Sequence, residues 1–285
     1  MEETGLVIKS NALIEASYSL TIMEQAIILA CIGQIRKDEV VTDKTMYKIS
    51  VADYIDLTDA DKGTAYRDMK NAVIRLRRRE VRLFELPNGG GRVKNKGRVR
   101  IAGWVQTIEY SDDAGEVWLR FNHDMLPYLT NLSKNFTKYS LGNVSKMSSR
   151  FGIRLYELLV DWRKSKQNRQ KHEVTLIWFK RAFGLEDKYP RANDLRKRVL
   201  DPAVKDINTH SDFCVSYAEK KTGRKITHLE FTFKLKKEKP KNTKSKQQNL
   251  ESWKSYIESN ARPGETYEQA GERLKKNNRK LVEAT

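Results

Sequence analysis

Cysteine is scarce in this sequence, which argues against a disulfide framework. Only Cys31 and Cys214 occur among 285 residues. Both stand among apolar neighbours in segments that we predict to be regular structure, so we expect two buried free thiols and neither a disulfide nor a metal pair. This cysteine usage fits the reducing environment of a cytoplasm.

Long apolar runs are also missing. No stretch approaches the roughly 18 apolar residues that a membrane-spanning helix needs. The first residues, MEETGLVIKS, begin with acidic side chains and lack the basic-then-apolar order of a signal peptide. We therefore expect a cytoplasmic protein with no membrane partner.

Histidine is the third scarcity, and it argues against one class of enzyme. The four histidines are His123, His172, His210 and His228. No two of them have metal-binding spacing, which disfavours a nicking initiator or relaxase with its tyrosine nucleophile and histidine-bound metal. Asp112, Asp113 and Glu116 fall at a predicted turn between strands, which explains them without a metal. We expect no catalytic activity, no metal and no cofactor.

Positive charge is abundant instead. Lys and Arg number 55 against 37 Asp and Glu, giving a formal net charge of +18. A protein this basic usually binds a polyanion, with nucleic acid as the first candidate and an anionic membrane surface as the second. RNA is an alternative to DNA on charge alone, but the aromatic residues fall mainly at alternating, core-like positions and form no evident stacking platform.

The segment from Tyr189 to Asn208 combines this charge with helical periodicity. Asn193 or Asp194 is a good helix N-cap, because a short polar side chain can accept a hydrogen bond from an unpaired backbone N–H. The apolar stripe that follows is Leu195, Val199, Ala203 and Ile207. The other face carries Arg191, Arg196, Lys197 and Arg198. Such a helix can rest on a small core and present its basic half to a DNA major groove, although a solvated charged face is the commoner role of a basic helix.

The neighbouring segments favour the DNA interpretation. A short predicted helix, Trp178 to Leu185, precedes this segment, and a predicted hairpin, Phe213 to Leu235, follows it. Helix, helix and two-stranded hairpin is the order of a winged helix-turn-helix. The hairpin turn KKTGR contains Lys220, Lys221 and Arg224. We predict that it is a wing tip over phosphates, with an ordinary solvated turn as the alternative.

Pro202 lies inside the predicted recognition helix. A proline there removes one backbone hydrogen bond and clashes with the preceding turn. Either the helix kinks at this point, or a second segment begins at Asp201.

The first half of the chain repeats this plan. Thr21 and Glu24 fit a capping box ahead of a helix that we predict to be core or a dimer surface. A basic helix follows from Gly63 to Arg79, and its apolar stripe is Tyr66, Met69, Val73 and Leu76. The glycine turn at residues 87–91 lies in strand-like sequence beyond it. We predict a wing tip there and not a P-loop, because no Gly-Lys-Ser/Thr ends the turn.

The predicted fold is α+β, with two tandem winged-helix (winged helix-turn-helix) domains and a basic C-terminal tail. We place the first domain at residues 1–135 and the second at residues 136–236. Residues 237–285 are predicted to form a basic linker followed by two short helices, Leu250 to Ser259 and Thr266 to Asn278. Their apolar content is too low for an independent hydrophobic core, so we do not expect a third domain.

Three stretches resemble one protein family. They are VIKSNALIEASYSLT near the start, SSRFGIRLYELLVDW at the second capped helix, and LRKRVLDPAVKDIN in the recognition segment. From about Val7 to Lys236 the chain resembles the replication initiator (Rep) proteins of iteron-containing plasmids. The last two stretches together make the resemblance quite specific.

This resemblance implies two winged-helix domains related by pseudosymmetry, and a function in plasmid DNA replication and copy control. A monomer would bind directly repeated double-stranded DNA elements, the iterons, at the origin. A homodimer, in equilibrium with the monomer and formed through the first domain, would bind an operator inverted repeat and repress the protein's own gene. The initiator would help to melt an AT-rich segment, contact its single-stranded DNA, and recruit the host replication initiator and replicative helicase.

The resemblance also assigns roles to residues. In the second domain, the expected base-contacting residues are Arg191, Asn193, Asp194, Arg196, Lys197 and Arg198. In the first domain, the expected contacts to the DNA backbone come from Arg67, Lys70, Arg75 and Arg78. A plain winged-helix transcriptional repressor without initiator activity is the alternative, since its DNA-binding physics would be the same.

Overall fold

The computed structural model describes residues 5–35, 41–91, 99–165, 170–236, 268–270 and 272–274. The chain divides into two units, residues 1–236 and residues 237–285. In the second unit, residues 268–270 and 272–274 are helical, and Ala270 and Leu274 form a small buried cluster. The predicted linker and the helix predicted for residues 250–259 lie outside the described residues.

The first winged-helix domain is built on three helices and a three-stranded antiparallel sheet. Its elements are α2 (Ile22–Ile32), β3 (Tyr47–Ser50), α3 (Val51–Thr58), α4 (Ala65–Leu76), β6 (Val105–Ser111) and β7 (Glu116–Phe121), with strand order β3-β7-β6. The predicted capping box is confirmed: the Thr21 side chain accepts from the Glu24 N–H, and the Glu24 carboxylate accepts from the Thr21 N–H. Ser50 and Asp53 cap α3 in the same way. Both caps supply partners to N–H groups that a helix start leaves unpaired.

The second winged-helix domain has the same connectivity. Its elements are α6 (Arg150–Ser165), β9 (Lys171–Thr175), α7 (Leu176–Ala182), α8 (Ala192–Leu195), a π-helical turn (Arg196–Leu200), α9 (Asp201–His210), β10 (Phe213–Thr222) and β11 (Lys225–Leu235). The strand order is β10-β11-β9. In both domains the last strand of the hairpin therefore pairs with the strand that follows the first helix. The predicted fold, two tandem winged helices, is confirmed by this repeated topology.

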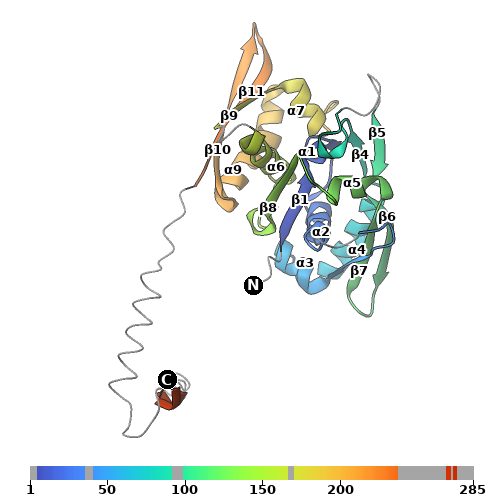
Figure 1. The fold of residues 1–285 in the computed structure, drawn as a ribbon. Coiled ribbons are helices and arrows are strands. Elements are labelled where there is room, and N and C mark those ends of the chain that lie inside the picture. The colour runs from blue at the N-terminus through green and yellow to red at the C-terminus, as the bar shows by residue number, and fades with distance from the viewer. Residues whose placement is uncertain are drawn as a thin grey trace. The chain divides into compact units, whose positions relative to one another are not determined.

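Further short elements lie around the two domains. They are β1 (Leu6–Ser10), α1 (Asn11–Ile14), β2 (Ser17–Tyr18), β4 (Glu80–Leu83), β5 (Arg100–Gly103), α5 (Leu126–Leu129), β8 (Phe136–Ser140) and the 3₁₀ turns η1 (Pro87–Gly89), η2 (His123–Met125) and η3 (Leu141–Asn143). Strand β1 pairs with β8, and Figure 1 shows this pair between α6 and the helices of the first domain. The predicted boundary between residues 135 and 136 separates these two paired strands; it stays a prediction.

The buried side chains form one continuous core through both domains. Helix α2 is buried on most of its surface, because Ile27, Ile28 and Leu29 are all 1–2% exposed. The stripe predicted for the recognition segment is likewise buried. Among the described helices, none is long and apolar enough to cross a membrane.

Two sequence predictions about single residues were wrong. The N-cap of α8 is Arg191, which makes no side-chain capping bond, so Asn193 and Asp194 lie inside the first turn. Cys214 is exposed, whereas Cys31 is buried as expected. In β10 the side chains of Phe213 and Val215 are buried, and strand alternation therefore turns Cys214 to solvent.

Pro202 is accommodated without ending the recognition helix. The backbone stays helical from α8 through the π-helical turn into α9, and Pro202 stands in the first turn of α9. The N–H of Asp201 donates to the carbonyl of Arg196, five residues earlier. The π-helical turn widens the helix just before Pro202, which makes room for the proline ring and for the hydrogen bond that its missing N–H cannot form.

The wing of the first domain was also misplaced. The hairpin that pairs with β3 is β6–β7, and its turn is residues 112–115. The glycine turn at residues 87–91 belongs to the β4–β5 hairpin, which pairs with β2. Its Asn88 side chain binds the backbone of Asn131 and Ser133, so this turn is packed against the protein.

A buried ionic network connects β1 with α6. The Glu157 carboxylate is fully buried and accepts hydrogen bonds from Lys9 (2.6 Å), Tyr139 (2.5 Å) and Arg154 (3.0 Å). Arg154 also donates to the carbonyl of Ile14 at 2.8 Å. Burial alone would raise the pKa of Glu157, but the charges of Lys9 and Arg154 lower it below its usual range. The carboxylate is therefore held ionised inside the core.

Candidate nucleic-acid interface

The recognition helix of the second domain, residues 192–210, is anchored by its apolar side. Leu195, Val199, Leu200, Ala203 and Ile207 are each 3% exposed or less. This burial fixes which side chains face outward, because residues three and four apart share one face of a helix. The outward face carries the predicted cations.

The turn between α7 and the recognition helix is held by a lysine that sequence reasoning missed. The Lys180 ammonium donates to the carbonyls of Lys188 at 2.9 Å and Tyr189 at 3.0 Å. Tyr189 has a positive φ of 52°, which reverses the chain ahead of α8. Nothing in the sequence pattern distinguishes this lysine from the many exposed ones.

The predicted residues of the recognition helix fall into two groups. Arg191, Asn193, Lys197 and Arg198 are exposed, and their side chains make no hydrogen bond or ion pair with any described residue. Asp194 is partly buried. Arg196 differs from its neighbours, because it already has an anionic partner within the protein.

That partner is Glu219 on β10. The Arg196 guanidinium donates to both carboxylate oxygens, at 2.7 Å and 3.3 Å, and this hydrogen-bonded contact raises the pKa of Arg196. A second bond between the same elements runs from the Tyr217 hydroxyl to Asp201, at 2.7 Å. Helix and wing are thus joined by two polar contacts, and Arg196 is not free in the unbound protein.

The three predicted cations of the second domain's wing differ in whether they have an acidic partner within the protein. Lys220 and Lys221 both lie within β10 and not in the turn. Lys220 forms ion pairs with Glu173 and with Glu230, the latter at 3.0 Å. Lys221 and Arg224 are exposed and have no partner among the described residues. Gly223, with a φ of 62°, forms the turn between the strands. Lys221 and Arg224 are therefore the two predicted wing residues available to a phosphate.

Most predicted cations of the first domain have an acidic neighbour within the protein. Arg67 lies 3.4 Å from Asp68, and Arg75 lies 3.5 Å from the buried carboxylate of Glu24. Arg79 binds Glu24 through two guanidinium nitrogens, at 3.0–3.1 Å.

Lys70 is held by the β6–β7 wing. It lies 2.8 Å from Asp112 and 4.1 Å from the centre of the Tyr110 ring. Hydrogen bonds from Lys70 and Tyr66 lower the pKa of Asp112. Of the four predicted residues, Arg78 alone is exposed with no partner among the described residues. The acidic turn, with Asp112 and Asp113, also makes this wing unsuited to a phosphate backbone.

The described residues contain no group of three His, Cys, Asp or Glu side chains that could hold a metal ion. Within that part of the chain, the features that point to a ligand at the recognition helix are its exposed cations and its hydrogen-bonded turn. These are suited to the phosphates and base edges of nucleic acid. The fold and this helix define a tandem winged-helix protein of the DNA-binding class.

Comparisons with known proteins narrow this class. A family model described as "Initiator Replication protein, WH1" matches residues 6–160, and one described as "Initiator Rep protein, WH2" matches residues 175–233. The chain belongs to the replication initiator (Rep) protein family of iteron-containing plasmids.

Individual relatives agree with this assignment. A replication initiation protein of Escherichia coli is 27% identical over 242 residues, which cover 81% of this chain and 70% of the relative. The PI protein of Escherichia coli is 28% identical over 213 residues, covering 66% of this chain and 69% of the relative. The crystal structure of Pi initiator protein in complex with iteron DNA has a TM-score of 0.64 at 20% identity, covering 84% of this chain and all of that one. Because the sequence identity is only 20%, the similarity to the Pi initiator structure is evidence for the fold alone.

Proposed function

We propose that this replication initiator binds directly repeated double-stranded DNA elements, the iterons, at a plasmid origin. The recognition helix enters the major groove, and the β10–β11 wing lies along the backbone. The observation that carries this proposal is a group of exposed cations at the start of that helix, above a buried apolar stripe. They are Arg191, Lys197 and Arg198, and none has a partner among the described residues. The fold shared with the Pi initiator, whose structure contains iteron DNA, supports it.

The two domains contribute differently in this proposal. The second domain contacts bases through the predicted residues Arg191, Asn193, Asp194, Arg196, Lys197 and Arg198, after Arg196 exchanges Glu219 for DNA. The first domain contacts the DNA backbone, chiefly through Arg78, since Arg67, Lys70 and Arg75 have acidic neighbours within 4 Å. In this arrangement the backbone contacts position the protein on the duplex, and the base contacts give the preference for one DNA sequence.

Family membership supports the remaining activities that we propose. The bound initiator promotes melting of an AT-rich segment, contacts the resulting single strand, and recruits the host replication initiator and replicative helicase. A homodimer in equilibrium with the monomer binds an operator inverted repeat and represses the protein's own gene. The proposal includes no catalytic step and no cofactor.

Binding to DNA tests the first part of the proposal. Fluorescence anisotropy would compare a duplex from upstream of the protein's own gene with a scrambled duplex, across a salt series. We expect strong preference for the native duplex, and log K falling by roughly 0.9 per phosphate neutralised for each unit of log salt. Equal binding to both duplexes would contradict sequence-specific recognition.

A matched pair of variants locates the interface. Arg198→Ala should weaken specific binding by about 1–3 kcal/mol if the guanidinium makes a bidentate base contact. Lys146→Ala removes another exposed cation, outside the recognition helix and the wing, and should leave specific binding unchanged. Equal losses for both variants would show that net charge, not this helix, determines affinity.

Origin melting separates an initiator from a plain repressor. Permanganate footprinting on a supercoiled origin plasmid should show unpaired thymines only when the protein is added. Specific binding without any melting, in the presence of the host proteins, would favour the repressor alternative.

A further inference from the structure

A cavity of about 570 Å³ opens between the two domains, away from the recognition helix. One wall consists of β1, α1 and the segment after β4, and the opposite wall of α6, β9 and α7. The volume lies in the range of small-molecule sites, roughly 300–1,000 Å³. Nothing in the DNA-binding proposal uses this cavity.

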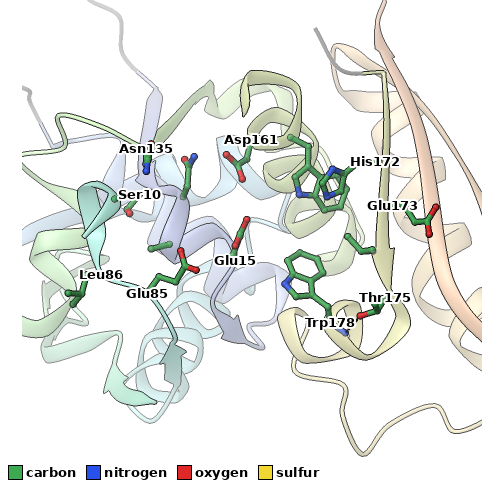
Figure 2. A pocket seen from close by; sticks show the side chains of 15 residues that line it. Ser10, Glu15, Glu85, Leu86, Asn135, Asp161, His172, Glu173, Thr175 and Trp178 are labelled. Atoms are coloured by element: carbon green, nitrogen blue, oxygen red, sulfur yellow. Dashed lines mark hydrogen bonds between the residues drawn. The ribbon is translucent and has the colours of Figure 1, made fainter. Parts of the chain in front are cut away.

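Three carboxylates face the space inside it. Figure 2 shows Glu15 between Asp161 and Glu85, with the indole of Trp178 on its other side, and the charges of Asp161 and Glu85 both act on Glu15. None of the three forms an ion pair with a described residue. Glu173 also lines the cavity, but Figure 2 shows its side chain pointing away, where Lys220 binds it. Among the residues that the structure describes, no Lys or Arg side chain lines this acidic cavity, which is unexpected in a chain with a net charge of +18.

Two buried polar atoms in its wall have no hydrogen-bond partner in the part of the chain that the structure describes. Asp161 is 3% exposed and Ser10 is 1% exposed, and both residues line the cavity. The Oδ1 atom of Asp161 and the Oγ atom of Ser10 have no hydrogen-bond partner among the described residues. A buried polar group left unpaired costs free energy, so these atoms are suited to a donor that enters from the cavity.

The electrostatics point in the same direction. Burial, together with the charges of Asp161 and Glu85, raises the pKa of Glu15 to about 7 despite an opposing effect of Arg181. Burial raises the pKa of Asp161 to about 6, although the charge of Lys164 and a hydrogen bond from the Thr137 side chain act to lower it. In both groups burial outweighs the opposing positive charge, so a cation bound in the cavity would lower both pKa values.

The aromatic side chains indicate which kind of cation fits. Trp162 stacks on His172 with ring centres 4.2 Å apart, and Trp178 lies 6.1 Å from Trp162. Indole faces attract organic cations, whereas a metal ion needs a compact set of ligands. The described residues contain no group of three His, Cys, Asp or Glu side chains that could hold a metal.

We propose that this cavity binds an organic cation bearing alkylammonium or guanidinium groups, which Glu15, Glu85 and Asp161 neutralise and Ser10 and Trp178 help to position. A free polyamine and a Lys or Arg side chain of another protein share this chemistry. Since the walls come from both domains, the bound cation bridges them. This site is independent of the proposed DNA function.

Calorimetric titration of the full chain with spermidine, at constant ionic strength, tests the proposal. We expect saturable one-to-one binding that Asp161→Asn and Glu15→Gln each weaken about 10- to 100-fold, because a hydrogen bond to a charged group is lost. Glu186→Gln removes an exposed carboxylate elsewhere and should have no effect. If Asp161→Asn fails to fold, Glu15→Gln carries the test, since Glu15 is only partly buried.

A second probe separates the two sources of the cation. Cavity-dependent binding of N-acetyl-arginine methylamide but not spermidine would support the site and assign it to a protein side chain. Binding should also weaken as the pH falls from about 8 to about 5, because protons compete for Glu15 and Asp161. The other titratable or charged groups nearby are His172, Glu85, Glu173, Lys164, Arg181 and Lys220.

Three results would overturn the proposal. The first is the absence of saturable binding for both probes. The second is equal binding by the wild type, the two cavity variants and the Glu186→Gln control, which would show general charge attraction. The third is an affinity that does not change over this pH range.

Discussion

Replacing Glu157 with Gln should destabilise the protein strongly without altering its shape. Glu157 is fully buried and is the anion shared by Lys9 at 2.6 Å and Arg154 at 3.0 Å. Glu157→Gln leaves both cations buried without their counter-charge. Breaking a buried ion pair by removing one partner costs about 3–5 kcal/mol. We expect a loss at the lower end of this range, about 3 kcal/mol, because Arg154 keeps its hydrogen bonds to the backbone carbonyls of Ile14 and Ala16.

A double variant tests whether charge is the cause. Lys9→Met/Glu157→Gln removes the ammonium together with the carboxylate and should recover part of the loss. Urea-induced unfolding near neutral pH, followed by circular dichroism and tryptophan fluorescence, measures all three free energies. A loss below about 1 kcal/mol for Glu157→Gln, or no recovery in the double variant, would refute the reasoning.

The same network predicts a pH dependence. The pKa of Glu157 is lowered in the folded state, so its contribution is present above the ordinary Glu pKa of about 4.3 and is lost as the pH falls through the folded value. The difference in stability between the wild type and Glu157→Gln should therefore be constant near neutral pH and shrink in acid. A difference that stays constant down to about pH 2 would contradict the ionised carboxylate.

Three further predictions concern the second domain and the thiols. Glu219→Gln should strengthen DNA binding and steepen its salt dependence by up to roughly one phosphate equivalent, because it releases Arg196; weaker specific binding would mean instead that Glu219 orients Arg196. Val199→Ala should lower the free energy of unfolding by about 2 kcal/mol, since Val199 is fully buried, and a change within about 0.5 kcal/mol in urea unfolding would contradict its place in the core. Titration of the native protein with a thiol reagent should modify Cys214 quickly, whereas Cys31 reacts only after unfolding because burial raises its pKa; two fast thiols would contradict this.

Local patterns predicted most of the fold. The capping box at Thr21 and the buried stripe that includes Leu195 and Ile207 were both correct. Each depends on residues within a few positions of one another, so the sequence contains all the information needed. The N-cap was misplaced because the prediction relied on the preference for Asn at N-cap positions. In the structure, the turn at Tyr189 determines where the helix begins, so Asn193 lies inside the first turn.

Predictions about the candidate interface were less complete. The basic face of the recognition helix was placed correctly, and its role in DNA binding stays a proposal. The sequence did not show that Arg196 pairs with Glu219, 23 residues away, or that Lys220 pairs with Glu173, 47 residues away. Such partners are set by strand register and by the packing of helix on sheet. Neither can be read from local spacing.

The sequence by itself determined the charge, the repeated order of helices and strands, and the family of this protein. The charge depends on composition and the order of elements on short-range periodicity, whereas the family was identified from the resemblance of three stretches and agrees with the matching family models. The tertiary structure decided which cations are free, which carboxylate is buried between Lys9 and Arg154, and which side chains enclose the cavity at Asp161. These features join residues up to 148 positions apart, and contacts at that range form only when the whole chain packs.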